Sequence, residues 1–292
     1  MKDTYEVLEQ IKWKTPDHTG MNVNIKNQVP YLTYPALEKT GAVVHGFSTR
    51  LGGVSQGVCS SMNLSFTRGD APEAVHENYH RIAEAIGFPY ESIVCSDQTH
   101  TTDVLRVTAA DRGNGITRER QYTDVDGLIT NEPGVTLATF YADCGPLILV
   151  DPVKKAIGLS HSGWRGTVGN IGGRTVEKMI EEFGSEPKDL IVAIGPSICM
   201  DCYEVSEDVA TEFKHAYAPV LWDKILFDKG NGKYQLNLWE ACRENFLRAG
   251  ILSEHISMPE ICTCCNPEFL FSHRASKGKR GNLAAFLMLK DL

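Results

Sequence analysis

The sequence predicts an α+β fold of the broad α/β type, in which mixed sheets pack against flanking helices in a single domain. Strand-like apolar runs outnumber helical patterns. They occur in consecutive groups with single helices between them, which argues against a doubly wound parallel sheet. No repeat or Pro/Gly/Ser-rich linker divides the 292 residues. We expect residues 1–40 to be an N-terminal extension packed on the domain, and residues 41–292 to form the domain.

The predicted strands are short apolar runs, several of them bounded by Gly, Pro, Asp or Asn. Up to residue 161 they are residues 42–49, 91–96, 103–108, 126–130, 135–142, 146–151 and 156–161. Beyond it they are residues 190–195, 233–238, 268–274 and 282–289. The runs 146–151 and 156–161 flank the turn sequence PVKK and predict an antiparallel hairpin.

Four segments have the apolar periodicity of amphipathic helices. Glycine follows three of them, as expected where a helix ends. The segments are residues 71–86 (N-cap Asp70, stop Gly87), 168–183 (stop Gly184), 206 to about 217 (N-cap Ser206) and 238–249 (stop Gly250). The most polar interruption, residues 109–124, predicts a surface loop within the domain.

Composition limits the class of partner. A net charge of -8 argues against nucleic acid or an anionic membrane, because both require a basic face. The N-terminal residues lack the apolar segment of a signal peptide, and the late run 283–289 is too short to span a bilayer. Nine cysteines, an odd number, suit a reducing compartment. We expect a cytoplasmic monomer or homodimer that acts on small molecules.

The stretch YADCGPLILVDPVKKAIGLSHSGWRG carries the candidate chemistry. A hairpin that closes on the PVKK turn places His161 opposite Pro146. Cys144 follows two residues beyond, on the same face. Diagonal neighbours are about 7–8 Å apart, so both side chains could reach one zinc ion at about 2.0–2.3 Å. A one-residue slip would put them on opposite faces.

A third ligand is available in SDQTHTTD, where His100 follows another apolar strand. Asp97, Gln98 and Asp103 are nearby orienting partners. Three Cys/His ligands leave zinc one open position, as in catalytic sites. On spacing alone an alternative stays open, in which Cys144 is a small buried hydrophobe and His161 a hydrogen-bonded core histidine.

Eight motifs occur in order along the chain: HGFSTRLGGVS, MNLS, SDQTH, DGLIT, ADCGPLILVD, SHSGWRGT, IGPSICMDCYEV and FLFSHR. Over about residues 40–289 the sequence resembles the bacterial laccase-domain family. Its members were first described as multicopper polyphenol oxidoreductases and later as zinc-containing purine nucleoside phosphorylases. The resemblance implies a fold akin to a four-layer α-β-β-α sandwich. It also implies that His100, Cys144 and His161 are the metal ligands.

The resemblance further implies phosphorolysis of adenosine and inosine, activity on methylthioadenosine, and side adenosine deaminase activity. Zinc is the implied cofactor, with copper as the alternative. The chain departs from the family pattern in two places. The loop 109–124 lengthens the spacing between His100 and Cys144. Asn282 stands where the family usually carries an arginine, so we expect no binding role there.

Phosphorolysis requires a phosphate site. Arg50 follows a strand in a glycine-rich turn, and a guanidinium matches phosphate bidentately. A helix expected to begin near Thr167 would offer free N–H groups to an anion, with Arg165 adding charge. Each arginine also has a structural interpretation: Arg50 would stabilise a turn, and Arg165 would pair with a surface carboxylate.

Two polar residues beside the expected ligands complete the candidate site. Gln98 is predicted to bind substrate or phosphate. Asp143 is predicted to act as an acid or base, or to orient a ligand histidine.

Three other functions fit part of this pattern. Cys144 with His161 as its base would make a thiol hydrolase or deamidase. One cysteine and two histidines also suit copper in a polyphenol oxidase, although a multicopper centre needs more histidines than these. A metal-binding interaction module would fill the open coordination position with a partner.

The segments CMDC (199–202) and CTCC (262–265) together offer four thiolates for zinc. C-x-x-C is a normal half-site, but C-x-C-C is irregular, so free buried thiols are the interpretation that the pattern favours.

Overall fold

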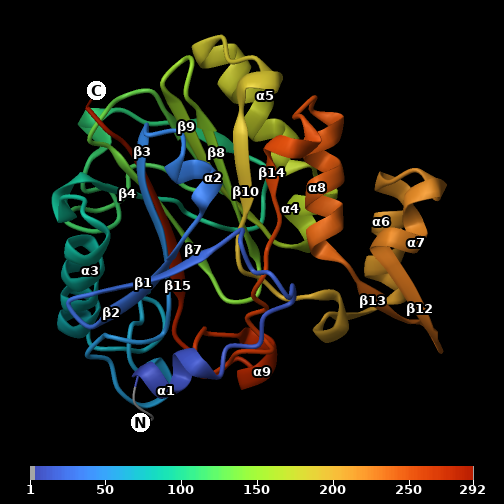
Figure 1. The fold of residues 1–292 in the computed structure, drawn as a ribbon, viewed down its shortest axis with the longest axis horizontal. Coiled ribbons are helices and arrows are strands. Elements are labelled where there is room, and N and C mark those ends of the chain that lie inside the picture. Colours follow the sequence, from blue (N-terminus) through green and yellow to red (C-terminus); the bar gives the residue numbers. More distant parts are fainter. Residues whose placement is uncertain (1–3, 292) are drawn as a thin grey trace.

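The computed structural model describes residues 4–291. Two six-stranded sheets pack face to face, and helices cover both outer faces (Figure 1). Helix α3 (Pro72–Ile86) packs on the first sheet. Helices α5 (Ile171–Phe183) and α8 (Leu238–Arg248) pack on the second. The four-layer α-β-β-α arrangement and the mixed α+β class are therefore confirmed.

The first sheet has its C-terminal strand in the middle. Its order is β1 (Asn22–Lys26), β2 (Val29–Thr33), β3 (Val43–Ser48), β15 (Leu283–Leu289), β7 (Thr136–Tyr141) and β4 (Ile93–Cys95). Strand β15 runs antiparallel to both β3 and β7, whereas β4 runs parallel to β7. Residues 22–33 thus supply the strands at one edge of this sheet.

The second sheet contains the predicted hairpin. Its order is β14 (Ile256–Ser257), β10 (Ile191–Ile194), β8 (Gly145–Asp151), β9 (Ala156–Ser162), β6 (Gly127–Thr130) and β5 (Val104–Arg106). In the β8–β9 pair His161 lies opposite Pro146, which confirms the predicted register. All side chains of both strands are buried, as expected for a sheet covered on two faces.

Three apolar cores separate the four layers. The central core joins the sheets through side chains such as Phe47, Ile148 and Leu287. The α3 core contains Tyr79 and Phe286, and the α5–α8 core fills the far side of the second sheet. Helix α3 packs on the first sheet because its apolar side chains lie along one face. The helix ends at Gly87, which adopts φ 100°.

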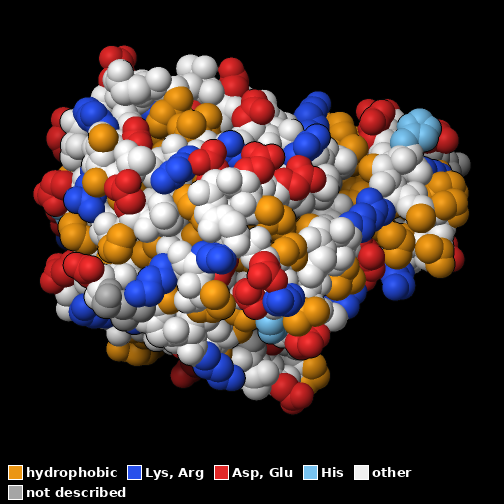
Figure 2. All heavy atoms as spheres, turned by 90° about the horizontal axis from the view of Figure 1, so that it is seen from above, with side chains coloured by type: hydrophobic (Ala, Val, Ile, Leu, Met, Phe, Trp, Pro, Cys, Tyr) orange, Lys and Arg blue, Asp and Glu red, His pale blue; other side chains and the backbone are white. Residues whose placement is uncertain are grey.

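A smaller lobe projects from one side of this body (Figures 1 and 2). Its sheet has the order β11 (Glu204–Ser206), β13 (Lys233–Leu236), β12 (Leu226–Gly230). Helices α6 (Glu207–Ala216) and α7 (Trp222–Ile225) accompany it. The remaining short helices are α1 (Thr4–Glu9), α2 (Pro35–Glu38), α4 (Trp164–Val168) and α9 (His273–Ser276).

The surface carries charges of both signs. On the face in Figure 2, acidic and basic side chains are interspersed over the body. Within residues 4–291 no helix is long and apolar enough to cross a bilayer.

Some predicted elements differ from the structure. The strand predicted at 268–274 is wrong: residues 269–272 are buried, but the segment turns through amides bonded to the Asn266 carbonyl and enters α9. Helix α5 begins at Ile171 rather than 168, because Asn170 at φ 63° caps it with its side chain. Strands β1, β2, β11, β12 and β14 were not predicted, since several are exposed and polar and β14 has only two residues.

We expect Phe286→Ala to lower the free energy of unfolding by about 3–5 kcal/mol, measured in urea. Phe286 is fully buried on β15 and its ring lies 4.9 Å from that of Phe88. The matched control is Phe227→Ala, because Phe227 is 60% exposed on the lobe. This control should change stability by less than about 0.5 kcal/mol. Equal losses in both variants would contradict the central role of β15.

Candidate active site

His161 occupies the end of β9, buried between the two sheets. Its Nδ1 lies 2.7 Å from Oδ1 of Asp126, which is also fully buried. Asp126 immediately precedes β6, and β6 pairs with β9, so the sheet itself brings the two side chains together. Because Asp126 occupies Nδ1, the Nε2 lone pair of His161 remains available as a ligand.

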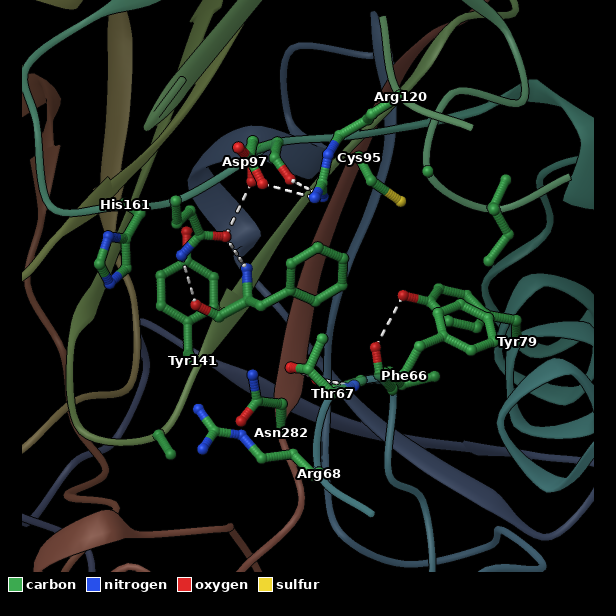
Figure 3. A pocket seen from close by; sticks show the side chains of 18 of the residues that line it. Phe66, Thr67, Arg68, Tyr79, Cys95, Asp97, Arg120, Tyr141, His161 and Asn282 are labelled. Carbon is green, nitrogen blue, oxygen red and sulfur yellow. Dashed lines mark hydrogen bonds and ion pairs between the residues drawn. The ribbon is translucent and has the colours of Figure 1, made fainter. Parts of the chain in front are cut away.

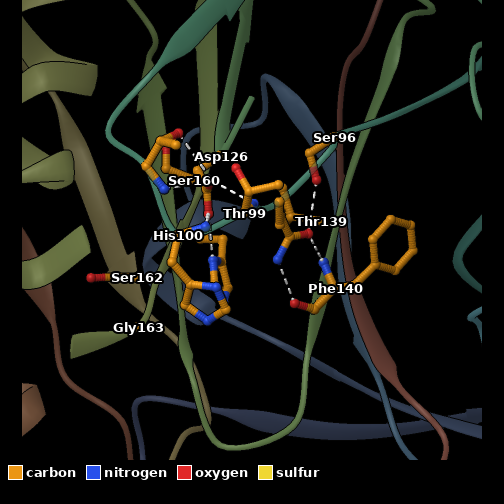
Figure 4. A network of polar contacts seen from close by, with 12 residues as sticks. Ser96, Thr99, His100, Asp126, Thr139, Phe140, Ser160, Ser162 and Gly163 are labelled. Atoms are coloured by element: carbon orange, nitrogen blue, oxygen red, sulfur yellow. Dashed lines mark hydrogen bonds and ion pairs between the residues drawn. The ribbon is translucent and has the colours of Figure 1, made fainter. Parts of the chain in front are cut away.

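The Asp126 carboxylate also organises the loop that carries His100 (Figure 4). It accepts hydrogen bonds from the amides of Thr99 (2.9 Å), His100 (3.2 Å) and Thr101 (2.9 Å). This wrapping holds His100 at φ 68°, an uncommon conformation for a residue other than glycine. Burial opposes ionisation of Asp126, but the hydrogen bonds from His161, Thr101 and Thr99 hold its pKa below the usual range.

Asp126 is not among the site residues predicted from the sequence. The available signal was a carboxylate placed directly before the apolar strand of the DGLIT motif. A carboxylate in that position is buried as soon as the strand enters the sheet, and therefore needs partners.

Cys144 approaches both histidines just before β8 begins. The ligand atoms of His100, Cys144 and His161 all lie within 4.8 Å of one another. The rings of His100 and His161 are 4.9 Å apart at 80°. Ligand atoms arranged tetrahedrally at about 2.0–2.3 Å from one zinc ion are about 3.3–3.8 Å apart, which is comparable with this spacing. The three predicted ligands therefore form one group that can hold a metal.

Gly163 permits this close approach. A Cβ atom at that position would lie 2.9 Å from Cδ2 of His100 and 3.1 Å from Sγ of Cys144. Contacts this short do not occur without movement of the neighbours, so a side chain at 163 would push the two ligands apart.

Cys144 and His161 form a coupled acid–base pair. Burial disfavours the thiolate, but the imidazoles of His161 and His100 prevail and lower the pKa of Cys144 to about 6. Burial likewise disfavours the imidazolium, but Cys144 and Asp126 raise the pKa of His161 to about 9. At neutral pH the metal-free pair is thus a thiolate beside an imidazolium, and a metal ion bound there would displace the proton of His161.

Asp143 and Gln98 are both held by protein groups. Asp143, at φ 88°, accepts from the Thr263 hydroxyl (2.6 Å) and the Arg274 amide (2.7 Å). Gln98 lines the cavity, but its amide pairs with both backbone groups of Phe140, at 2.6 and 2.8 Å. In this arrangement both side chains position the backbone around the ligands.

The two arginines assigned to phosphate lie elsewhere. Arg50 donates to the carbonyls of Ser60 and Pro267 and packs over Phe271. Arg165 is exposed and stacks on Trp164, with 4.3 Å from its guanidinium carbon to the ring. The helix expected near Thr167 is the short α4, which begins at Trp164. Neither arginine is among the residues that line the cavity beside the ligands.

A cavity of about 800 Å³ opens beside the three ligands (Figure 3). The loop 109–124, predicted as a surface loop, forms one wall through residues 115–123. Arg120 of this loop pairs with Asp97, at 2.5 Å. Arg68, Arg280 and Asn282 line another part of the cavity. A metal site with an open side therefore faces a space large enough for a nucleoside-sized molecule.

The sequence model of the family described as multi-copper polyphenol oxidoreductase laccase matches residues 44–290. The chain belongs to this family. It is 39% identical to "Purine nucleoside phosphorylase YlmD" of Geobacillus stearothermophilus over 85% of this chain and 90% of that protein. It is 38% identical to the protein of the same name from Bacillus subtilis, over 85% and 89%.

Solved structures of relatives share the fold. The Bacillus licheniformis hypothetical protein YfiH superposes with a TM-score of 0.86 at 32% identity, covering 92% of this chain and 99% of that one. YlmD from Geobacillus stearothermophilus gives 0.84 at 35% identity, with the same coverage. This is an enzyme family whose curated members include proteins named purine nucleoside phosphorylase, and the His–Cys–His group lies within the matched region.

We expect Asp126→Asn to weaken metal binding about 10–100-fold, because the amide cannot accept from His161 and three backbone N–H groups together. Competition with a chelator of known affinity measures this change. Asp103→Asn, at an exposed carboxylate on the same loop, is the matched control and should leave affinity unchanged. Unchanged affinity in Asp126→Asn would refute the orienting role.

The low pKa of Cys144 predicts its reactivity once metal has been removed. A thiolate forms above the pKa, so the rate of Cys144 alkylation should rise as pH passes through about 6. An ordinary cysteine reaches its midpoint near about 8.5. Peptide mass spectrometry after pulses of iodoacetamide follows this rate. In the same digest Cys59, whose burial raises its pKa, should react only at higher pH. A Cys144 midpoint above pH 8 would contradict the pairing.

Proposed function

We propose that the chain is a zinc-dependent purine nucleoside phosphorylase. It would cleave adenosine, inosine and methylthioadenosine with phosphate, releasing the free base and the pentose 1-phosphate. One observation carries the proposal: a single cavity is lined by the His–Cys–His group, by arginines that include Arg68 and Arg280, and by aromatic side chains. Metal, anion and purine would each find matching chemistry there.

Arg68 and Arg280 are the proposed phosphate ligands, in place of Arg50 and Arg165. Within residues 4–291 the Arg68 guanidinium has no hydrogen-bond or ion-pair partner, and Nε of Arg280 is buried without an acceptor. Burial and the positive charge of Arg68 lower the pKa of Arg280 to about 10. Two guanidinium groups that repel each other at a cavity wall are stabilised by an anion between them.

The position of Arg68 supports this assignment. In Figure 3 its guanidinium extends beside Asn282 toward the side of the cavity where Tyr141 and His161 lie. A phosphate held there would be near the metal ligands and could reach the sugar carbon of a nucleoside in the same space.

The purine would occupy the part of the cavity beside α3. Phe66 lines it with its side chain 37% exposed, and its ring stacks on Tyr79 at 5.9 Å and 12°. Ile116 of the loop 109–124 adds a further apolar contact. A flat aromatic base stacks favourably on such a surface.

The donor set fits zinc. Two imidazoles and one thiolate leave a fourth position open toward the cavity, as catalytic zinc sites require. When bound, zinc would supply a Lewis-acidic position that polarises an oxygen of the phosphate or sugar. Asp126 holds His161 by Nδ1, and Asp143 is proposed to position Cys144 through Thr263 and Arg274. In the proposed step phosphate attacks the anomeric carbon while the glycosidic C–N bond breaks, and the purine leaves with the electron pair of that bond and takes up a proton from dihydrogen phosphate or solvent.

A multicopper oxidase is less well supported. In the part of the chain that is described, the two groups of metal-binding side chains contain only two histidines, His100 and His161. A multicopper centre requires several more.

We also propose a weaker adenosine deaminase activity at the same zinc site, because one open coordination position can serve either reaction. In phosphate-free buffer adenosine would yield inosine and ammonia. Loss of both activities in His161→Ala would be consistent with a shared site, whereas persistence of deamination alone would refute sharing.

A thiol hydrolase is the second candidate. Cys144, His161 and Asp126 form a nucleophile, base and orienting carboxylate in series. His100 favours the metal instead, since its ligand atom lies within 4.8 Å of both. Metal analysis separates the two functions: rapid alkylation of Cys144 in an active, metal-free protein would favour the hydrolase.

Incubation with adenosine and phosphate tests the proposal directly. Chromatography should show adenine and ribose 1-phosphate formed in equal amounts, and only when phosphate is present. No release of adenine across zinc, copper and manganese and across phosphate concentrations would refute it.

The arginine assignment predicts a specific kinetic change. Arg68→Ala and Arg280→Ala should each raise the KM for phosphate about 10- to 100-fold, since each removes a charge-assisted hydrogen bond worth about 1.5–3 kcal/mol. Arg174→Ala is the control, because the only ion-pair partner of this exposed side chain among residues 4–291 is Glu177 on α5. An unchanged KM for phosphate in both cavity variants would remove Arg68 and Arg280 from the site.

A further inference from the structure

We propose that Cys199, Cys202, Cys262 and Cys265 form a second metal site, a closed structural zinc site with four thiolate ligands. Their four sulfur atoms lie within 4.8 Å of one another. This site is separate from the His–Cys–His group and shares no ligand with it. The proposal does not depend on the function proposed above.

The distances between the sulfurs fit one tetrahedral ion. Sγ of Cys265 lies 3.9 Å from Sγ of Cys199 and 3.5 Å from Sγ of Cys202. Four sulfurs at about 2.3 Å from a single zinc ion are about 3.8 Å apart. A disulfide would require about 2.05 Å. The spacing is therefore that of ligands around an ion.

The four cysteines that the structure brings together have the spacing of a regular zinc motif. Cys262 and Cys265 form a C-x-x-C pair, as do Cys199 and Cys202. Two such pairs are the usual pattern of structural zinc sites. Cys264, which lies outside the group, made the segment CTCC look irregular.

Backbone and charge surroundings suit thiolates. Sγ of Cys262 accepts from the amides of Cys199 (3.2 Å) and Cys265 (3.4 Å). The Lys14 ammonium, which bonds Asp201 at 3.0 Å, also faces Cys199. Four thiolates around Zn²⁺ carry a net charge of −2, which amides and an adjacent cation stabilise.

The site would join two distant segments, 199–202 and 262–265, and a third segment, residues 12–13, bonds to the second. Ser197 and Cys262 are bridged, and the Trp13 segment pairs with Ile261. Asn266 bonds to both the Lys12 carbonyl and the Cys262 carbonyl. With four protein ligands no position would remain for substrate, in contrast to the open site at His161.

Hydrogen bonds connect the four-cysteine group to Asp143, which precedes Cys144 in the chain. Thr263, which lies between the two ligand cysteines of its segment, bonds Oδ1 of Asp143. Arg274 bonds Oδ2 of Asp143 through its amide and the Cys202 carbonyl through its guanidinium. The structural zinc would therefore hold the residue next to Cys144 in place.

Metal stoichiometry tests the proposal. Protein purified without chelator should contain two zinc ions per chain by mass spectrometry. Cys202→Ser and His161→Ala should each retain one, and Cys264→Ser, the matched control, should retain two. If the His–Cys–His site proves empty, the wild type should contain one ion and Cys202→Ser none, so the two proposals fail separately.

Other outcomes would overturn the assignment. Two of them concern zinc content: no change in Cys202→Ser, or a loss in Cys264→Ser but not in Cys262→Ser. A third is the detection of iron with inorganic sulfide in the purified protein in place of zinc. The fourth is the detection of disulfides among the four cysteines after alkylation without reductant.

A spectroscopic measurement keeps the test decisive if Cys202→Ser does not fold. His161→Ala loaded with Co²⁺ should show the intense thiolate-to-cobalt charge-transfer band of a four-sulfur site. Cys265→His should retain the ion with a weaker band, because a histidine replaces one thiolate. A cobalt spectrum of octahedral, oxygen-ligated type in His161→Ala would overturn the proposal.

Discussion

The buried carboxylate of Asp126 is the constraint on which the site depends. A charge without solvent is unfavourable unless hydrogen bonds compensate it, and Asp126 obtains them from the imidazole of His161 and from three consecutive amides of residues 99–101. The hydrogen bonds that compensate Asp126 therefore orient His161 and also fix the conformation of the loop that carries His100. The backbone of His100 accepts a positive φ as a result.

Each of the two sheets positions different residues of the site. The second sheet provides His161 and Asp126 from adjacent strands, in a register set by the β8–β9 hairpin. The first sheet, through Phe140 and Gln98, fixes the segment that leads into His100. Cys144 lies where the chain passes from β7 of one sheet to β8 of the other. The ligands therefore meet because the sheets pack face to face.

Cysteine sulfur is a proposed metal ligand in both groups, but the surroundings of the two groups differ. Around Cys144 the ligands are few and one side opens to a cavity with arginines and aromatic rings. Around Cys199 the sulfurs face one another, and apolar side chains such as Ile198 and Trp239 pack against them. An open coordination position allows chemistry, whereas a closed one contributes only stability.

The sequence by itself determined the strands with clear apolar runs, the helices that end at glycine, and the hairpin register that pairs His161 with Pro146, because these depend on local periodicity and turn residues. The same register indicated Cys144 and His161 as a possible ligand pair, and the resemblance to the family added His100. Only the tertiary structure decided the role of Asp126, the engagement of Arg50 with carbonyls, the place of Arg68 and Arg280 at the cavity, and the gathering of four cysteines. These depend on which buried groups find partners across distant segments; the sequence offered the candidate side chains, such as the two cysteine segments, but local periodicity does not specify their partners.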